Sequence, residues 1–188
     1  QILGDSTFIG VLLVPSEKNQ KFVIKVDEEQ LTFVNSKENT DYYVYLNRIS
    51  DYNKRLDSLN EEFRSAQRSL PQYMLKVFVD SLSAQARRIN DEMRVFQRNT
   101  AAANKGTLMG SVVATSTYLD DPPQEVLADR ILFNEYYVQH FFDNFAWNDP
   151  RIFNTVVVEQ KLKEFCNIIY QVDSPQLDTF IVDALNKA

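Results

Sequence analysis

Few residues in this chain could do chemistry. It contains one histidine, His140, and one cysteine, Cys166. His140 and Asp143 stand three residues apart, so on a helix they would offer two metal ligands from adjacent turns. A stable transition-metal site needs three or four protein ligands, and only carboxylates could complete this one. We therefore expect no metal and no other cofactor.

Other catalytic arrangements have little support in the sequence. One cysteine cannot form an intrachain disulfide or a Cys-x-x-Cys redox motif, and Cys166, placed in an apolar helical pattern, is expected to be a buried, inert thiol. A serine nucleophile would lack the glycine-rich elbow and would depend on His140. No phosphate-binding or dinucleotide-binding glycine loop occurs. The residues alone thus favour a non-enzymatic domain.

Composition excludes two further classes of function. The 188 residues carry 26 acidic and 20 basic side chains, a net charge of −6, which disfavours nucleic acid as a general partner. No run of about 18 apolar residues could span a membrane. With 44% hydrophobic residues and only four glycines, the chain is expected to form a globular domain of long regular elements.

Two consecutive heptad patterns predict a long antiparallel helical hairpin over residues 37–100. Ser36 is a suitable N-cap, and a break at Pro71 separates the two patterns. Their apolar positions alternate steps of three and four residues: Tyr42, Tyr45, Ile49, Tyr52, Leu56, Leu59 and Phe63, then Leu75, Val79, Leu82, Ala86, Ile89, Met93 and Phe96. Two interpretations remain open: neighbouring helices of an ordinary bundle, or a projecting coiled-coil arm that binds a partner.

The rest of the chain completes a mainly α (α+β) fold. Residues 1–36 contain three short strand candidates at 7–14, 21–26 and 31–34, expected to be antiparallel and the remnant of a β-rich module. Further helices are expected at 106–119, 122–146, 150–171 and 174–187. The last three starts share an Asp or Ser cap followed by proline. The predicted helical domain therefore covers 37–188, a helical bundle with the hairpin attached.

The second hairpin helix carries an excess of basic residues: Arg87, Arg88, Arg94 and Arg98. Asp91 lies four residues after the first and three before the third of these, which is the spacing of a solvated ion-pair ladder. The alternative is a surface for an anionic partner.

Polar and aromatic residues alternate densely over residues 137–153, which read YVQHFFDNFAWNDPRIF. The aromatic side chains should anchor a core, and polar groups among them must be paired. We predict that Arg151 is substantially buried and pairs with a carboxylate, Asp143 being favoured. The candidate site residues are therefore His140, Asp143, Asn144, Asp149 and Arg151, either as a fold-fixing motif or as a site for a small molecule or partner.

This run resembles one characteristic of an uncharacterised helical domain in Bacteroides-type thioredoxin-like, or thiol-disulfide interchange, proteins, where it precedes the thioredoxin-like domain. Residues 36–39 (SKEN) are similar to that family's S-x-E-N helix entry. Residues 171–174 (QVDS) are similar to its Q-x-P-D-S stretch, without the proline. After Arg151, residues 154–156 (NTV) depart from the family's R-T-P.

The resemblance implies an exported cell-envelope protein whose redox chemistry belongs to a downstream Cys-x-x-Cys domain. By this resemblance, the chain would be a non-catalytic accessory domain that positions, or docks, a protein partner or the downstream domain. The alternative from the residues is a free-standing coiled-coil interaction or assembly module unrelated to redox chemistry. A hydrolase or metalloenzyme built on His140 is the third class.

Overall fold

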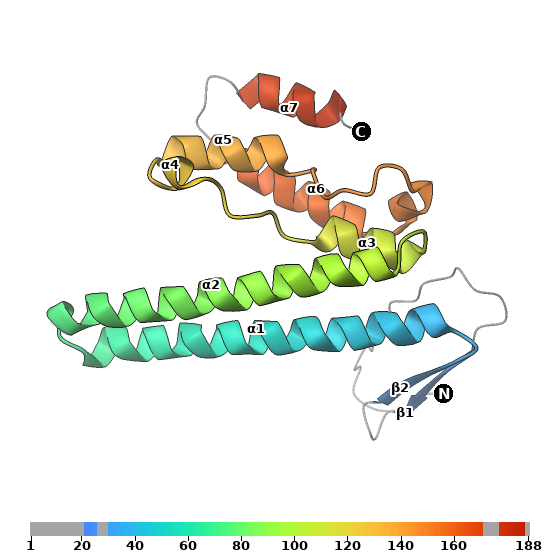
Figure 1. The fold of residues 1–188 in the computed structure, drawn as a ribbon, viewed down its shortest axis with the longest axis horizontal. Coiled ribbons are helices and arrows are strands. Elements are labelled where there is room, and N and C mark those ends of the chain that lie inside the picture. Colours follow the sequence, from blue (N-terminus) through green and yellow to red (C-terminus); the bar gives the residue numbers. More distant parts are fainter. Residues whose placement is uncertain (1–20, 26–29, 171–176, 187–188) are drawn as a thin grey trace, which may run out of the picture.

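The computed structural model describes residues 21–25, 30–170 and 177–186. This part of the chain is mainly α-helical, as the sequence predicts, with one short strand pair at its N-terminal side (Figure 1). β1 (Lys21–Lys25) and β2 (Gln30–Val34) are antiparallel, with Phe22 opposite Phe33. The predicted strand at 7–14 lies outside the described residues.

The predicted hairpin is confirmed. α1 (Lys37–Ser69) and α2 (Gln72–Ala103) run antiparallel, and residues 70–71 join them. Ser36 caps α1, because its side-chain oxygen accepts a hydrogen bond from the Asn39 backbone N–H at 3.3 Å. Every residue of the two heptad patterns is buried or half-buried, so the periodicity identified the contact face correctly.

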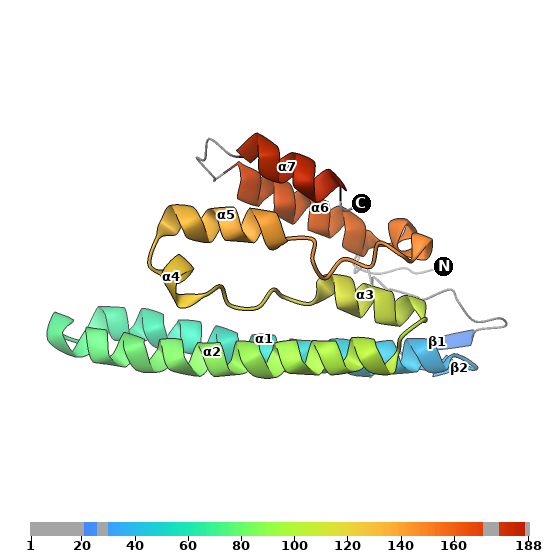
Figure 2. The same ribbon diagram turned by 45° about the horizontal axis from the view of Figure 1, so that its top comes forward.

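A second group of helices covers one end of the hairpin. α3 (Leu108–Ser116) lies directly on α2, and α5 (Arg130–His140), α6 (Val156–Ile169) and α7 (Leu177–Asn186) follow above it (Figure 2). Met109 and Val113 of α3 are almost completely buried. The main core surrounds them, with side chains from both hairpin helices, the 141–145 segment, Ile152 and α6. The opposite end of the hairpin extends away from this core as an arm.

The helix predicted at 122–146 is wrong in its extent. The structure has a single turn, α4 (Gln124–Leu127), then α5, and residues 141–149 are turns and loop. Asp129 causes the interruption, because its carboxylate accepts hydrogen bonds from the Ile131 and Leu132 N–H groups and so starts a new helix. Asp121 does not cap a helix; its side chain binds Arg94 instead.

The other predicted helix bounds need smaller corrections. The helix expected at 106–119 is shorter, since Gly106 has a φ of +87° and Thr107 is the N-cap of α3. The helix expected at 150–171 is split into a 3-10 turn, η2 (Pro150–Asn154), and α6, because Thr155 is extended. α7 agrees with the last predicted helix from Leu177 onward; the Ser174 start lies outside the described residues. Within the described ranges, no helix combines the length and apolarity required to cross a membrane.

Candidate functional site

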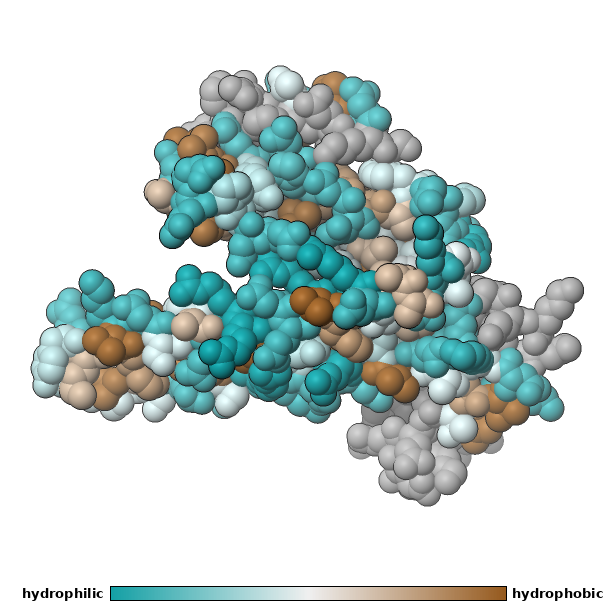
Figure 3. All heavy atoms as spheres, in the orientation of Figure 1, coloured by the Kyte–Doolittle hydropathy of each residue, from teal (hydrophilic) through white to brown (hydrophobic). Residues whose placement is uncertain are grey.

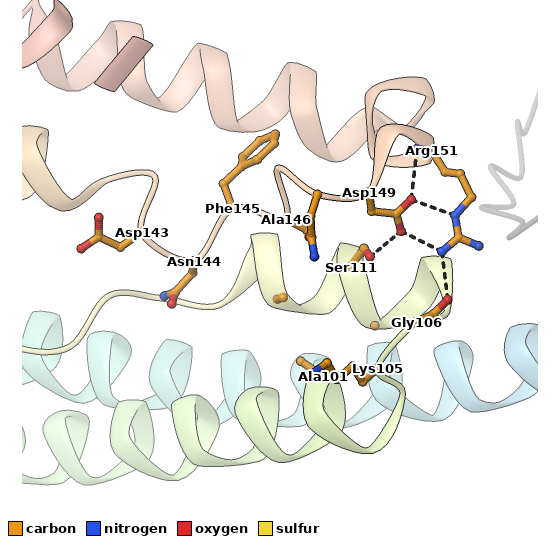
Figure 4. Close-up of a pocket in the computed structure, with 13 residues that line it drawn as sticks. Ala101, Lys105, Gly106, Ser111, Asp143, Asn144, Phe145, Ala146, Asp149 and Arg151 are labelled. Carbon is orange, nitrogen blue, oxygen red and sulfur yellow. Dashed lines mark hydrogen bonds and ion pairs between the residues drawn. The ribbon is translucent and has the colours of Figure 1, made fainter. Parts of the chain in front are cut away.

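Four of the five predicted site residues line one open cavity of about 510 Å³. The cavity lies between the C-terminal end of α2, α3 and the 143–151 loop (Figure 4). Asp143 and Asn144 stand at one end, and Asp149 and Arg151 at the other. Its floor is made of small residues, including Ala101, Gly110 and Ala114. His140 is not one of the lining residues.

Asp149 is the centre of the hydrogen-bond network at this site. Arg151 contacts it with two nitrogens, Nε to Oδ1 and Nη2 to Oδ2, both at 2.8 Å. The Ser111 hydroxyl donates to Oδ2 at 2.5 Å, and the Arg151 backbone N–H donates to Oδ1 at 3.1 Å. These contacts, the Arg151 side chain first, lower the pKa of Asp149 to about 2. The Asp149 carboxylate is therefore ionised at neutral pH and is no general base.

The prediction for Arg151 was wrong on two points. Its side chain is 47% exposed, and its carboxylate partner is Asp149, two residues away, rather than Asp143 at the far end of the cavity. The guanidinium also donates to the Gly106 carbonyl oxygen at 3.0 Å. Arg151 thus joins the loop to the turn between α2 and α3.

Asn144 and its neighbour Ala146 attach the same loop to the other end of α3. The Asn144 amide donates to the carbonyl oxygens of Thr117 and Tyr118 at 3.3 and 3.5 Å. The Ala146 N–H donates to the hydroxyl of Thr115, a fully buried residue, at 3.1 Å. Along its length, therefore, the loop is bonded to α3 and the segment after it.

His140 and Asp143 form a pair of their own at the end of α5. His140 Nδ1 lies 2.6 Å from Asp143 Oδ2, and the imidazole packs against the Tyr136 ring with centroids 4.3 Å apart. The pair lies at the last turn of the helix. Among the described residues, no group of three His, Cys, Asp or Glu side chains is placed to hold a metal ion.

Cys166 was predicted on the wrong face, and three features were not predicted from the sequence: the contact of Glu38, the tertiary contacts of Arg94 and the role of Gly110. Cys166 is exposed rather than buried. Glu38 of α1 accepts a hydrogen bond from the Met109 N–H at 2.7 Å, at the start of α3. Arg94 is buried, so the predicted solvated ladder is wrong at this residue. It bonds the Leu119 carbonyl oxygen and Asp121 Oδ1, each at 2.8 Å, and also pairs with Asp91. The i,i+3 spacing predicted the pair of Arg94 with Asp91, whereas no local pattern indicated its bonds to Leu119 and Asp121.

Gly110 is the third missed feature, and it explains how α3 can lie so close to α2. A Cβ built on Gly110 would stand 2.2 Å from the Asn104 carbonyl oxygen and 2.8 Å from its carbon. Both are backbone atoms, which cannot turn aside. The glycine therefore allows the close contact that forms the floor of the cavity.

The end of the hairpin arm is the second candidate surface. The first two turns of α2 are apolar except for Gln72 and Lys76. Leu75 and Val79 face α1, while Tyr73 and Val77 are 78% and 72% exposed, and Met74 is also exposed. Figure 3 shows hydrophobic side chains gathered at this end of the arm. A helix that is apolar on most sides is normally covered.

Comparison with known proteins gives no independent guide to the role of either surface. No protein family model matches the chain, and no curated protein or solved structure is similar enough to count as a match.

Proposed function

We propose that this chain is a non-catalytic helical domain that docks or positions another protein through its hairpin arm. The observation that carries the proposal is the end of the arm, where Tyr73, Met74 and Val77 leave apolar surface open beyond the main core. Exposed apolar surface of this kind marks interaction sites in soluble proteins.

The geometry of the 143–151 loop supports the same proposal. Asp149 receives its hydrogen bonds from Arg151 and Ser111, and Asn144 donates to backbone carbonyls. These polar groups hold the loop on α3, which favours the fold-fixing interpretation of the motif over a catalytic one. The basic residues of α2 also make contacts within the fold. Arg94 pairs with Asp121, and Arg98 pairs with Asp120. These ion pairs favour a structural role for these two arginines over a surface for an anionic partner.

The resemblance of residues 137–153 supports a more specific form of the proposal. In this form the chain is the accessory domain preceding a thioredoxin-like domain in a cell-envelope protein. One cysteine per chain is compatible with such a role, because dithiol exchange needs two thiols and would belong to the downstream domain. The alternative is a free-standing coiled-coil assembly module. The heptad pattern of the hairpin helices supports this alternative as well as it supports the accessory domain.

The coding sequence beyond Ala188 separates the two forms. A Cys-x-x-Cys thioredoxin-like domain there supports the accessory domain, and a stop codon supports the free-standing module. The His140→Ala variant tests the third class: an activity lost in this variant with the fold intact would contradict a non-catalytic role.

The docking role is tested in the parent protein with the double variant Tyr73→Ser, Val77→Ser. Thiol exchange with a small dithiol should be unchanged, while cross-linking of the parent to its protein partner in cells should be lost. Val44→Ser is the matched control, because Val44 is 64% exposed on α1 and lies at the other end of the hairpin. Unchanged cross-linking in the double variant would contradict docking through the arm.

A further inference from the structure

The end of the arm has a distinct charge as well as exposed apolar groups. Residues 63–79 include Arg64, Arg68 and Lys76 and no acidic residue; the nearest carboxylates, Glu62 and Asp80, lie just beyond. All three basic side chains are exposed, and within the described ranges none of them is joined to a carboxylate. We call this surface the arm tip; it is apolar in its centre and carries a charge of +3.

A complementary surface lies on the same side of the molecule, at the corner formed by α4 and α5. Ile131 is 57% exposed there, and Leu127 and Leu132 are exposed beside it. Residues 122–135 carry Glu125, Asp129 and Glu135 against Arg130 alone, a net charge of −2. We call this surface the α4–α5 corner; like the arm tip it is apolar in its centre, but it is acidic.

The two surfaces do not meet within one chain. Figure 3 shows the arm tip and the α4–α5 corner at the same end of the molecule, with an open notch between them. A two-fold axis along the viewing direction of Figure 1 would bring the arm of each copy level with the α4–α5 corner of the other. Each copy would then contribute both surfaces to one self-complementary contact.

We infer that the partner of the arm tip is the α4–α5 corner of a second copy of this chain, in a reciprocal two-fold dimer. This inference rests on the proposed function, because it takes the arm as the docking element. Charge complementarity favours a second copy over an unrelated protein, since the basic arm tip finds its acidic, apolar counterpart on the same molecule.

The exposed area also favours the reciprocal arrangement. Each surface exposes on the order of 300 Å² of apolar side chain, which alone is an ordinary patch on a monomer. A tip-to-tip contact would use one such patch per copy. The reciprocal contact uses two and adds the charged rim, which approaches the roughly 800 Å² per partner of a stable interface.

The test is the molar mass of the full 188-residue chain, measured by sedimentation equilibrium over micromolar concentrations. The wild type should form a dimer of twice its 21.8 kDa mass, and high salt should weaken the dimer because part of the attraction is between charges. Val77→Glu in the arm tip and Ile131→Lys in the corner should each weaken dimerisation about 100-fold, because each change places, in both symmetric contacts, a charge of the same sign as the surface that it faces. Val44→Glu, equally exposed but outside both surfaces, should leave the dimer unchanged.

Mixing the two weakened variants gives the sharpest outcome. A heterodimer of Val77→Glu with Ile131→Lys keeps one contact entirely wild type, so the mixture should dimerise more strongly than either variant alone. Circular dichroism of each variant should show unchanged helix content, which excludes loss of folding as the cause.

Several results would overturn the inference. A chain that is monomeric at all concentrations would do so, as would a dimer that Val77→Glu dissociates but Ile131→Lys does not, since that pattern describes a tip-to-tip contact. A monomer that sediments with phosphatidylcholine vesicles containing one third phosphatidylglycerol, and loses this binding in Val77→Glu, would assign the arm tip to a lipid surface. A monomer whose parent protein still loses its partner when the tip is changed would refute the dimer but keep the docking function.

Discussion

Asp149 and Arg151 are only two residues apart in sequence, yet they join distant parts of the fold. Asp149 is buried and reaches Ser111 of α3, while Arg151 is half-exposed and reaches the Gly106 carbonyl. The pair therefore connects the loop, α3 and the turn after α2. Its energetic value is limited by the exposure of the guanidinium, which remains hydrated in the absence of its partner.

Replacing Arg151 should accordingly have a modest effect. Arg151→Ala should lower the free energy of unfolding by about 1 kcal/mol, because Asp149 keeps its bonds from Ser111 and from the backbone. Urea melts of the single and double variants measure this. Arg151→Ala combined with Asp149→Ala should be non-additive, whereas Arg151→Ala combined with Asp143→Ala should be additive. Coupling between Arg151 and Asp143 would contradict the observed pairing.

The low pKa of Asp149 predicts a pH dependence of stability. The pKa is about 2 in the folded chain and about 3.9 in an unfolded one, so ionised Asp149 stabilises the fold above about pH 4. This contribution is lost as the pH falls through about 2. Urea melts from pH 6 to pH 2 should show wild type more stable than Asp149→Asn at pH 6, with the difference disappearing towards pH 2. A constant difference would indicate that the charge of Asp149 contributes nothing.

At the scale of elements, α3 depends on Gly110. Gly110→Ala should destabilise the protein by about 2–3 kcal/mol, because the new methyl group would overlap the Asn104 carbonyl and push α3 away from α2. Gly106→Ala is the comparison variant. Its Cβ would meet no atom within 4 Å, and only the φ of +87° opposes it, so we expect a cost of about 1 kcal/mol. Thermal melts of both variants compare them; equal costs would contradict the close contact.

Arg94 connects α2 to the segment that follows α3. The hydrogen bond to Asp121 raises the Arg94 pKa and lowers that of Asp121. Removing the buried guanidinium in Arg94→Ala should cost about 2 kcal/mol, because the Leu119 carbonyl loses its hydrogen bond and the packing of the buried side chain is lost, whereas Asp121 is 55% exposed and becomes hydrated. Arg98→Ala is the control: its side chain is about half exposed and pairs with Asp120, so it should cost less than about 1 kcal/mol. Equal effects in urea melts would contradict the structural role of Arg94.

The helical hairpin could be predicted from sequence because its information is local and repeated. Apolar residues at heptad spacing identify the contact face of each helix without information from the rest of the fold. α6 lacks this clarity, since it has apolar residues on both faces. It buries Val157 and Phe165 and leaves Leu162 and Cys166 exposed, so periodicity alone assigned the cysteine to the wrong face.

Side chains that form hydrogen bonds with backbone groups explain the incorrect helix bounds. Asp129 interrupts the helix predicted at 122–146 because its carboxylate binds two N–H groups at the start of α5. Four of the five candidate site residues, all but His140, line the same cavity, although no cavity was predicted from the sequence. Their pairing was not predicted correctly, because the aromatic neighbours of Arg151 suggested a burial that the 3-10 turn does not provide.

At the scale of the whole molecule, the core and the free end of the hairpin differ in burial and in charge. The covered end packs α3, the 143–151 loop and α6 around the first turns of α1. The arm beyond it presents exposed apolar residues and three basic side chains. This separation is the basis for assigning stability to the core and docking to the arm tip.

Site-specific cross-linking tests that assignment most directly. A photoreactive residue replaces Tyr73 in the purified chain, and isotopically labelled and unlabelled copies are mixed before irradiation. We expect cross-linked peptides that join position 73 of one copy to residues 124–132 of the other. Docking of the arm tip on the α4–α5 corner would be contradicted by cross-links confined to one chain or by links from position 73 to position 73. It would also be contradicted if a probe at Val44 linked to residues 124–132 of the other copy as well as the probe at position 73 does.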